Sequence, residues 1–147
     1  MILKPRLFRK PNKGHRLSRG LVGYWLLNES SGNKVFDLSG NGNTGTLVAN
    51  THWVPGGFGP SAILAPEFDY IGFDSEIVGA GDVTFWMWVY LTDKSDWPNL
   101  INNSKFVIYI SDTDGKVYLT SDFSTYAEGT VLPLNSLHLL KSICNCA

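Results

Sequence analysis

The sequence of 147 residues is 44% hydrophobic and 13% aromatic, enough for one domain with a core and too apolar for a wholly disordered chain. Its net charge is only −1, but the first 20 residues hold seven of the 12 basic residues and none of the 13 acidic ones. No stretch approaches the ~20 apolar residues of a membrane span. The charges that recur up to Arg19 leave no apolar segment for a cleavable secretory signal.

Residues 1–19 are expected to form a basic, extended leader, because Pro5 and Pro11 oppose a helix. This leader could be a solvated tail that docks loosely on the acidic remainder of the chain. Alternatively, it could anchor the protein to a polyanion or to a larger assembly. Nucleic acid is not expected as a partner except through the leader. Residues 20–147 form the expected domain, and the leader is expected to be dispensable for its folding.

Apolar runs of strand length begin directly after the leader. Residues 21–27 predict a first strand, and residues 34–36 predict a short second strand. The segment 37–45 is dense in Gly, Asn, Ser and Asp, which predicts a structured loop. Further short strands are predicted at residues 46–48, 62–64 and 70–73, with a second loop at residues 53–60.

The strongest strand signal covers residues 82–91. Bulky side chains alternate onto both of its faces, which predicts a central strand covered on both sides. From the strand signals we expect a set of core residues, namely Trp25, Phe36, Phe85, Met87 and Val89.

Asp114-Gly115 lies between the β-rich runs 106–110 and 116–120, and this arrangement predicts a hairpin. The tail at residues 134–140 could be a helical turn or a strand. Strand-length runs at intervals of 8–12 residues, with no sustained helical periodicity, predict an all-β fold, an antiparallel β-sandwich or jelly roll.

The order of these segments resembles the laminin G-like jelly-roll domains of the concanavalin A-like lectin and glucanase superfamily. Gly20–Glu29 is similar to the opening strand of that family, Val35–Leu47 to its second signature, and Asp82–Val89 to a later strand. The similarity covers about residues 20–137. The basic leader followed by this opening also resembles phage-associated members, which implies a virion or surface protein.

Two departures from the family pattern bear on the end of the chain. Ala65-Pro66 stands where the family has Asp-Gly, and residues 136–140 only loosely echo a later strand. The last strands of the jelly roll are therefore expected to be lacking. Such a chain would expose the edge of the strand at residues 24–27 and would be marginal in isolation, pairing or aggregating in solution.

The loop at residues 37–45 is a candidate calcium site, as the resemblance implies. Calcium takes oxygens from carboxylates, amides and backbone carbonyls. The expected ligands are Asp37, Asn41 and Asn43, with Glu29 as a further one. The alternative is a turn held only by hydrogen bonds from its own side chains.

Aromatic residues in predicted loops suit a lectin, because sugar rings stack on exposed aromatic faces. The candidates for ligand binding are Trp53, Trp97 and Tyr126, with Phe58 in addition. They could instead cap the core. His138, Cys144 and Cys146 lack a usual zinc spacing and indicate an unstructured tail.

No catalytic constellation is complete in the sequence. Glu67 and Asp69 begin the Glu-x-Asp-x-x-Glu spacing of some related glycosidases, but Gly72 stands at its last position. The sequence therefore predicts a non-catalytic binding or adhesion module, directed to a glycan or a glycosylated surface, in a phage virion or a cell-surface protein. The alternatives are a structural domain that binds only other protein subunits and the remnant of a glycoside hydrolase.

Overall fold

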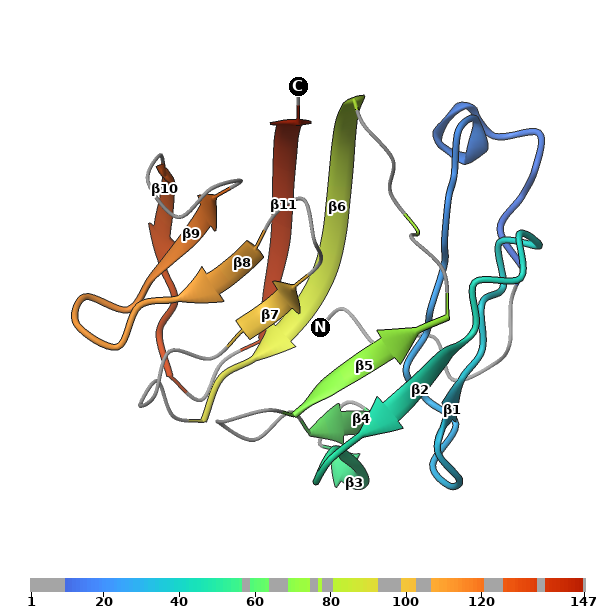
Figure 1. Cartoon of the computed structure of the whole chain (residues 1–147), viewed down its shortest axis with the longest axis horizontal. Helices are drawn as coiled ribbons and strands as arrows, with labels where there is room; N and C mark the ends of the chain where they lie inside the picture. The colour runs from blue at the N-terminus through green and yellow to red at the C-terminus, as the bar shows by residue number, and fades with distance from the viewer. Residues whose placement is uncertain are drawn as a thin grey trace. The chain divides into compact units, whose positions relative to one another are not determined.

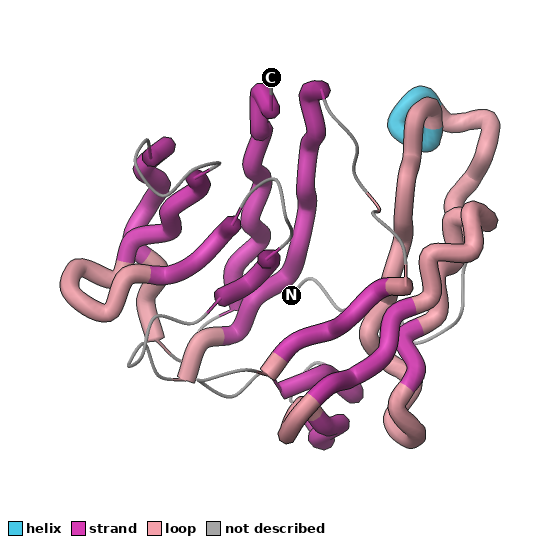
Figure 2. The backbone as a smooth tube through the Cα atoms, in the orientation of Figure 1, coloured by secondary structure: helices cyan, strands magenta, loops and turns pink. Residues whose placement is uncertain are grey.

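The computed structural model describes residues 10–56, 59–63, 69–74, 77, 81–92, 99–102, 107–120, 126–134 and 137–146. Within these ranges the paired strands are antiparallel and the helical content is one 3-10 turn, η1 at Arg16–Ser18 (Figure 2). The all-β, antiparallel prediction is therefore confirmed. No helix in the described ranges is long and apolar enough to cross a membrane. The chain divides into two compact units, Met1–Ile77 and Val78–Ala147, each with its own sheets.

The first unit contains a three-stranded sheet and a two-stranded ladder (Figure 1). The sheet has the order β1-β2-β5, with β1 at Lys34–Val35, β2 at Gly45–Val48 and β5 at Tyr70–Phe73. The ladder pairs β3 (His52–Gly56) with β4 (Gly59–Ile63).

A glycine at the start of β2 lets the sheet of the first unit pack closely. A Cβ atom on Gly45 would lie 2.6 Å from Cγ2 of Ile71 and 2.9 Å from Cε1 of Phe73, closer than van der Waals contact allows. Opposite Gly45, Val35 is fully buried, whereas the next residue, Phe36, is 50% exposed. The prediction that Phe36 is a core residue is wrong, because successive residues in extended chain face opposite sides and Val35 occupies the inner one.

The predicted first strand at residues 21–27 is reduced to a single bridge between Trp25 and Asp37. The N–H of Tyr24 donates to Oδ1 of Asp37 rather than to a neighbouring backbone, and Leu27 has a positive φ of 55° that interrupts extended pairing. Trp25 is half-buried, and its ring packs at 5.2 Å from that of Phe73.

The second unit contains a long two-stranded ladder and a four-stranded sheet (Figure 1). In the ladder, β6 (Gly81–Tyr90) pairs with β11 (Leu137–Cys146) from Leu137 opposite Tyr90 to Cys146 opposite Gly81. The tail is therefore a strand from Leu137 onward, and the expectation that Cys144 and Cys146 lie in an unstructured tail is wrong. The four-stranded sheet has the order β10-β9-β8-β7. Its strands are β7 at Asn99–Asn102, β8 at Val107–Ile110, β9 at Lys116–Thr120 and β10 at Tyr126–Val131.

The predicted hairpin through Asp114-Gly115 is confirmed as β8 and β9. Tyr109 opposes Tyr118 in its register, and their rings stack with centroids 5.5 Å apart. Gly115 adopts a φ of 70°, which a residue with a side chain rarely takes.

The core of the second unit forms around Leu91, Ile110 and Leu132, and Val89 packs against it. The residues of β6 alternate in exposure. The face that includes Val89 is half-buried, and the opposite face is exposed: Val83, Phe85, Met87 and Val89 against Thr84, Trp86, Trp88 and Tyr90. The prediction that both faces of this strand are covered is wrong. The aromatic bulk of the sequence suggested burial on both faces, but among the described residues the core cluster is contacted from the face that carries Val89.

Candidate functional site

The loop at residues 37–45 is organised around the carboxylate of Asp37. Its Oδ1 accepts hydrogen bonds from the N–H of Tyr24 at 3.0 Å and of Ser39 at 2.8 Å. Its Oδ2 accepts from the hydroxyl of Ser39 at 2.7 Å and from the N–H of Asn43 at 3.0 Å. Four donors from three residues therefore surround this carboxylate.

These contacts also set the protonation of Asp37. Burial by itself raises the pKa, but the hydrogen bonds from the backbone and side chain of Ser39 and from the N–H groups of Tyr24 and Asn43 together outweigh it. They hold the pKa of Asp37 below its ordinary 3.8. The charged form of Asp37 thus fixes the loop.

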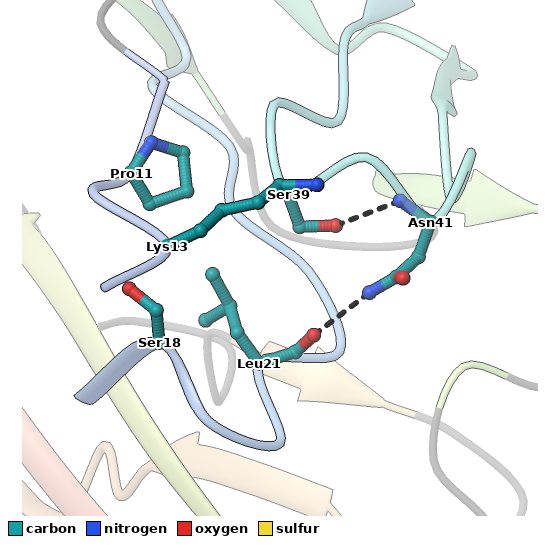
Figure 3. Close-up of a pocket in the computed structure, with 6 residues that line it drawn as sticks. All are labelled: Pro11, Lys13, Ser18, Leu21, Ser39 and Asn41. Atoms are coloured by element: carbon teal, nitrogen blue, oxygen red, sulfur yellow. Dashed lines mark hydrogen bonds between the residues drawn. The ribbon is translucent and has the colours of Figure 1, made fainter. Parts of the chain in front are cut away.

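The two asparagines of the predicted calcium loop tie it to the preceding segment. Nδ2 of Asn41 donates to the carbonyls of Leu21 at 2.7 Å (Figure 3) and of Val22 at 3.0 Å. Nδ2 of Asn43 also donates to the carbonyl of Val22, at 2.9 Å. Together with the hydrogen bonds of Asp37, these contacts are of the kind that the alternative interpretation of the loop expects, a turn held by hydrogen bonds from its own side chains.

Glu29 differs from the other three predicted ligands. Its Oε1 accepts a hydrogen bond from the N–H of Phe36 at 2.9 Å, whereas no described residue donates to its buried Oε2. The positive φ angles of Leu27 (55°) and Ser30 (66°) flank this position. A carboxylate oxygen that is buried with no described donor, next to residues with positive φ, is an oxygen to which a cation could bind.

A second oxygen near Glu29 in the sequence was not predicted as a ligand. Oδ1 of Asn28 is buried as well. The pairing of an amide with a carboxylate in consecutive residues could have indicated Asn28 as a ligand. The backbone conformation that buries both oxygens, however, cannot be inferred from the sequence. Among the described residues, no group of three His, Cys, Asp or Glu side chains gathers around a common point.

The predicted loop aromatics are divided between the two units, and two of them lie outside the described residues. Trp53 lies in β3, half-buried, and its Nε1 donates to the carbonyl of Gly32 at 2.9 Å. Tyr126 begins β10 in the other unit, opposite Thr120. Trp97 and Phe58 lie outside the described residues.

A different aromatic group stands on β6. Trp86 and Tyr90 are each 50% exposed and Trp88 is 40% exposed. They occupy alternate positions of one strand, so their side chains share one face. We call these three residues the aromatic row. The alternation is visible in the sequence, but its aromatic bulk predicts a second core face rather than an exposed one.

One carboxylate of the incomplete glycosidase spacing has a structural role. Asp69 is buried and its Oδ1 accepts the N–H of Asn50 at 2.9 Å. Glu67 lies outside the described residues. Asp69 therefore holds the segment that follows β2 in place.

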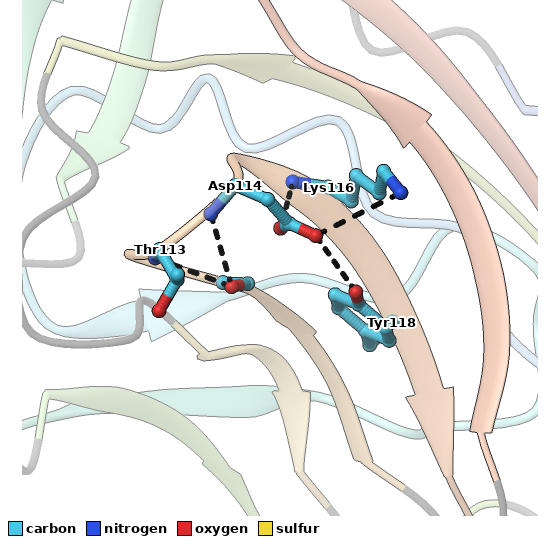
Figure 4. Close-up of polar contacts among 5 residues, drawn as sticks. Thr113, Asp114, Lys116 and Tyr118 are labelled. Carbon is cyan, nitrogen blue, oxygen red and sulfur yellow. Dashed lines mark hydrogen bonds and ion pairs between the residues drawn. The ribbon is translucent and has the colours of Figure 1, made fainter.

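The turn between β8 and β9 has its own carboxylate (Figure 4). Oδ1 of Asp114 accepts the N–H of Lys116 at 3.0 Å, and Oδ2 accepts the hydroxyl of Tyr118 at 2.8 Å. The backbone bond from Lys116 is the largest influence and lowers the pKa of Asp114, with help from the hydroxyls of Tyr118 and Ser111. These contacts fix the turn and leave Asp114 a structural residue.

No protein-family model, curated protein or solved structure matches this chain.

Proposed function

We propose that the protein is a non-enzymatic binding module that recognises carbohydrate through the aromatic row of β6. The observation that carries this proposal is the exposure of Trp86, Trp88 and Tyr90, between 40% and 50%, on one face of one strand. Large aromatic side chains usually bury most of their surface. Three of them side by side at a surface form a platform rather than scattered exposure.

Such a platform suits the apolar faces of sugar rings. The faces of indole and phenol rings are electron-rich and attract the C–H groups of a sugar. Alternate residues of a strand are about 7 Å apart, so the row could contact successive units of an oligosaccharide. The indole N–H of Trp88 at the ring edge can donate to a sugar hydroxyl.

The laminin G-like jelly roll is part of this proposal, and the antiparallel sheets of both units support it. The expected ligand is a glycan or a glycosylated surface, which the chain would bind as part of a virion or cell-surface protein. An exposed aromatic face also suits a second function, a structural domain that packs on another protein subunit.

A substitution in the aromatic row tests the proposal. A glycan array with the wild-type protein identifies a ligand, and Trp88→Ala is then expected to weaken its binding about tenfold, or about 1.4 kcal/mol. The matched control is Phe36→Ala, which removes an exposed aromatic side chain from the first unit. Binding that Trp88→Ala and Phe36→Ala reduce equally, or not at all, would contradict the proposal. Absence of glycan binding, together with self-association that Trp88→Ala weakens in sedimentation, would favour the assembly function.

We also propose that Glu29 helps to hold a calcium ion. A hard divalent cation takes oxygen ligands, and a buried carboxylate oxygen without a donor is costly unless a cation or a proton meets it. No described residue donates to Oε2 of Glu29, which makes it such an oxygen, and the buried amide oxygen of Asn28 could be a further ligand. The ion would fix the segment at residues 27–30 and, through the bond from Phe36 to Glu29, the end of β1.

Calcium is therefore expected to stabilise the wild-type protein and not Glu29→Gln. At a calcium concentration 100 times the dissociation constant, the gain would be about 2.7 kcal/mol. In a chelator, Glu29→Gln is expected to be at least as stable as the wild type, because it removes a buried charge. Asp74→Asn makes the same chemical change at an exposed site of the same unit and serves as the control in thermal melts. An equal calcium response in all three proteins would rule out the role of Glu29.

A further inference from the structure

A pocket of about 260 Å³ lies in the first unit, where the chain around η1 meets the loop at residues 37–45 (Figure 3). It is lined by Pro11, Lys13, Ser18, Leu21, Ser39 and Asn41. Sites for drug-sized ligands occupy about 300–1,000 Å³, so this pocket suits a smaller ligand, of the size of one sugar unit. Its walls come from segments some 20 residues apart in sequence, and the bond from Asn41 to Leu21 joins them.

Lys13 supplies the charge of the pocket. Its ammonium lies over the loop, 3.5 Å from the point where a Cβ atom of Gly40 would stand. No carboxylate among the described residues forms an ion pair with it. The one acid of the loop, Asp37, already accepts four hydrogen bonds through its two oxygens. An anionic group would therefore have Lys13 as its partner.

The two serines supply acceptors rather than donors. The hydroxyl of Ser18 donates to the carbonyl of Asn12 at 2.6 Å, and that of Ser39 donates to Oδ2 of Asp37 at 2.7 Å. Each hydroxyl has one proton and two lone pairs, so in these positions each oxygen can meet a ligand only as an acceptor. The oxygen of Ser39 already accepts the N–H of Asn41 at 3.2 Å (Figure 3) and has one lone pair left for a ligand. Both O–H and N–H groups donate to such oxygens, but a cationic ammonium would be repelled by Lys13, so neutral hydroxyls suit these positions best.

We propose that this pocket binds a sugar-sized acid, a molecule with one anionic group for Lys13 and hydroxyl groups for Ser18 and Ser39. Neither a bare anion nor a neutral sugar satisfies both sets of partners. The site lies in the first unit and uses none of the aromatic row, so it is independent of the function proposed for β6.

Isothermal titration calorimetry of the full chain with three probes tests this site. Glucuronate carries both chemical features, glucose only the hydroxyls, and inorganic sulfate only the anion. Glucuronate is expected to bind at least about tenfold more tightly than either of the others. Sulfate or glucose binding as tightly as glucuronate would overturn the proposal, as would no binding of glucuronate.

Two variants and a control locate the binding. Lys13→Gln is expected to weaken glucuronate about tenfold, and Ser18→Ala to weaken it less, since it removes one acceptor and no charge. Lys10→Gln removes the same charge from the same exposed segment but outside the pocket, and is expected to leave the affinity nearly unchanged. Equal losses in Lys10→Gln and Lys13→Gln would show general attraction to a basic segment and would refute the site.

Discussion

Replacing Ile110 by alanine is expected to lower the free energy of unfolding by about 2–5 kcal/mol. Ile110 has no exposed surface and lies in β8, at the centre of the core cluster with Leu91 and Leu132. Truncation removes buried methyl groups and leaves a cavity that packed neighbours fill only in part. Domains of this size are stable by about 5–15 kcal/mol, so the loss would be a large fraction of the total.

Urea denaturation measures this effect, and an exposed valine gives the control. Val131 ends β10 and is 46% exposed, so Val131→Ala is expected to change the stability by no more than about 0.5 kcal/mol. If Ile110→Ala and Val131→Ala unfold at the same urea concentration, β8 is not the centre of the core.

Replacing Asp37 by asparagine is expected to destabilise the first unit by about 2–4 kcal/mol at neutral pH. The amide offers one acceptor oxygen, and its NH₂ group would face N–H donors that now bond Oδ1 and Oδ2. Hydrogen bonds to a charged acceptor are stronger than those to a neutral one. The loop, its bond to Tyr24 and the bridge from Trp25 would loosen together.

This effect is expected to depend on pH in a defined direction. The pKa of Asp37 is lower in the folded chain than its ordinary 3.8, so the unfolded chain binds this proton more readily. The stability from Asp37 is therefore fully present above about pH 4 and falls as the pH drops from 3.8 through the folded-state pKa. The gap between wild type and Asp37→Asn should narrow over this window in urea titrations. A gap that stays constant down to that pKa would show that the charge of Asp37 is not what holds the loop.

Asp74→Asn is the control for this titration. Asp74 follows β5 and is exposed, so its replacement is expected to have a small effect on stability at neutral pH. A loss in Asp74→Asn as large as in Asp37→Asn would point to net charge rather than to the hydrogen bonds of the loop.

The same two aspartates show how far local sequence reaches. The turn at Asp114-Gly115 was predictable because its signal is local: two β-rich runs, a residue that tolerates positive φ, and a side chain that bonds the backbone two residues on. The structured loop at residues 37–45 was predictable for the same reason. The full role of Asp37 in the loop was not predictable. Three of its four hydrogen bonds come from Ser39 and Asn43, within six residues. The fourth comes from Tyr24, 13 residues earlier, and such a contact depends on the folded chain.

The sequence by itself determined the all-β character and the alternation of β6, since both follow from the two-residue repeat of an extended chain. The sequence also indicated Phe85, Met87 and Val89 as core residues, but it predicted that the opposite face of β6 is covered too. Only the tertiary structure decided that this opposite face is exposed. Val35 rather than Phe36 faces inward, and Val89 rather than Trp88 meets the core, because burial depends on which neighbour covers a face and not on how apolar the face is. The same holds for Glu29. Its residue type made it a candidate ligand, but only the folded backbone buries one of its oxygens where no described residue donates to it.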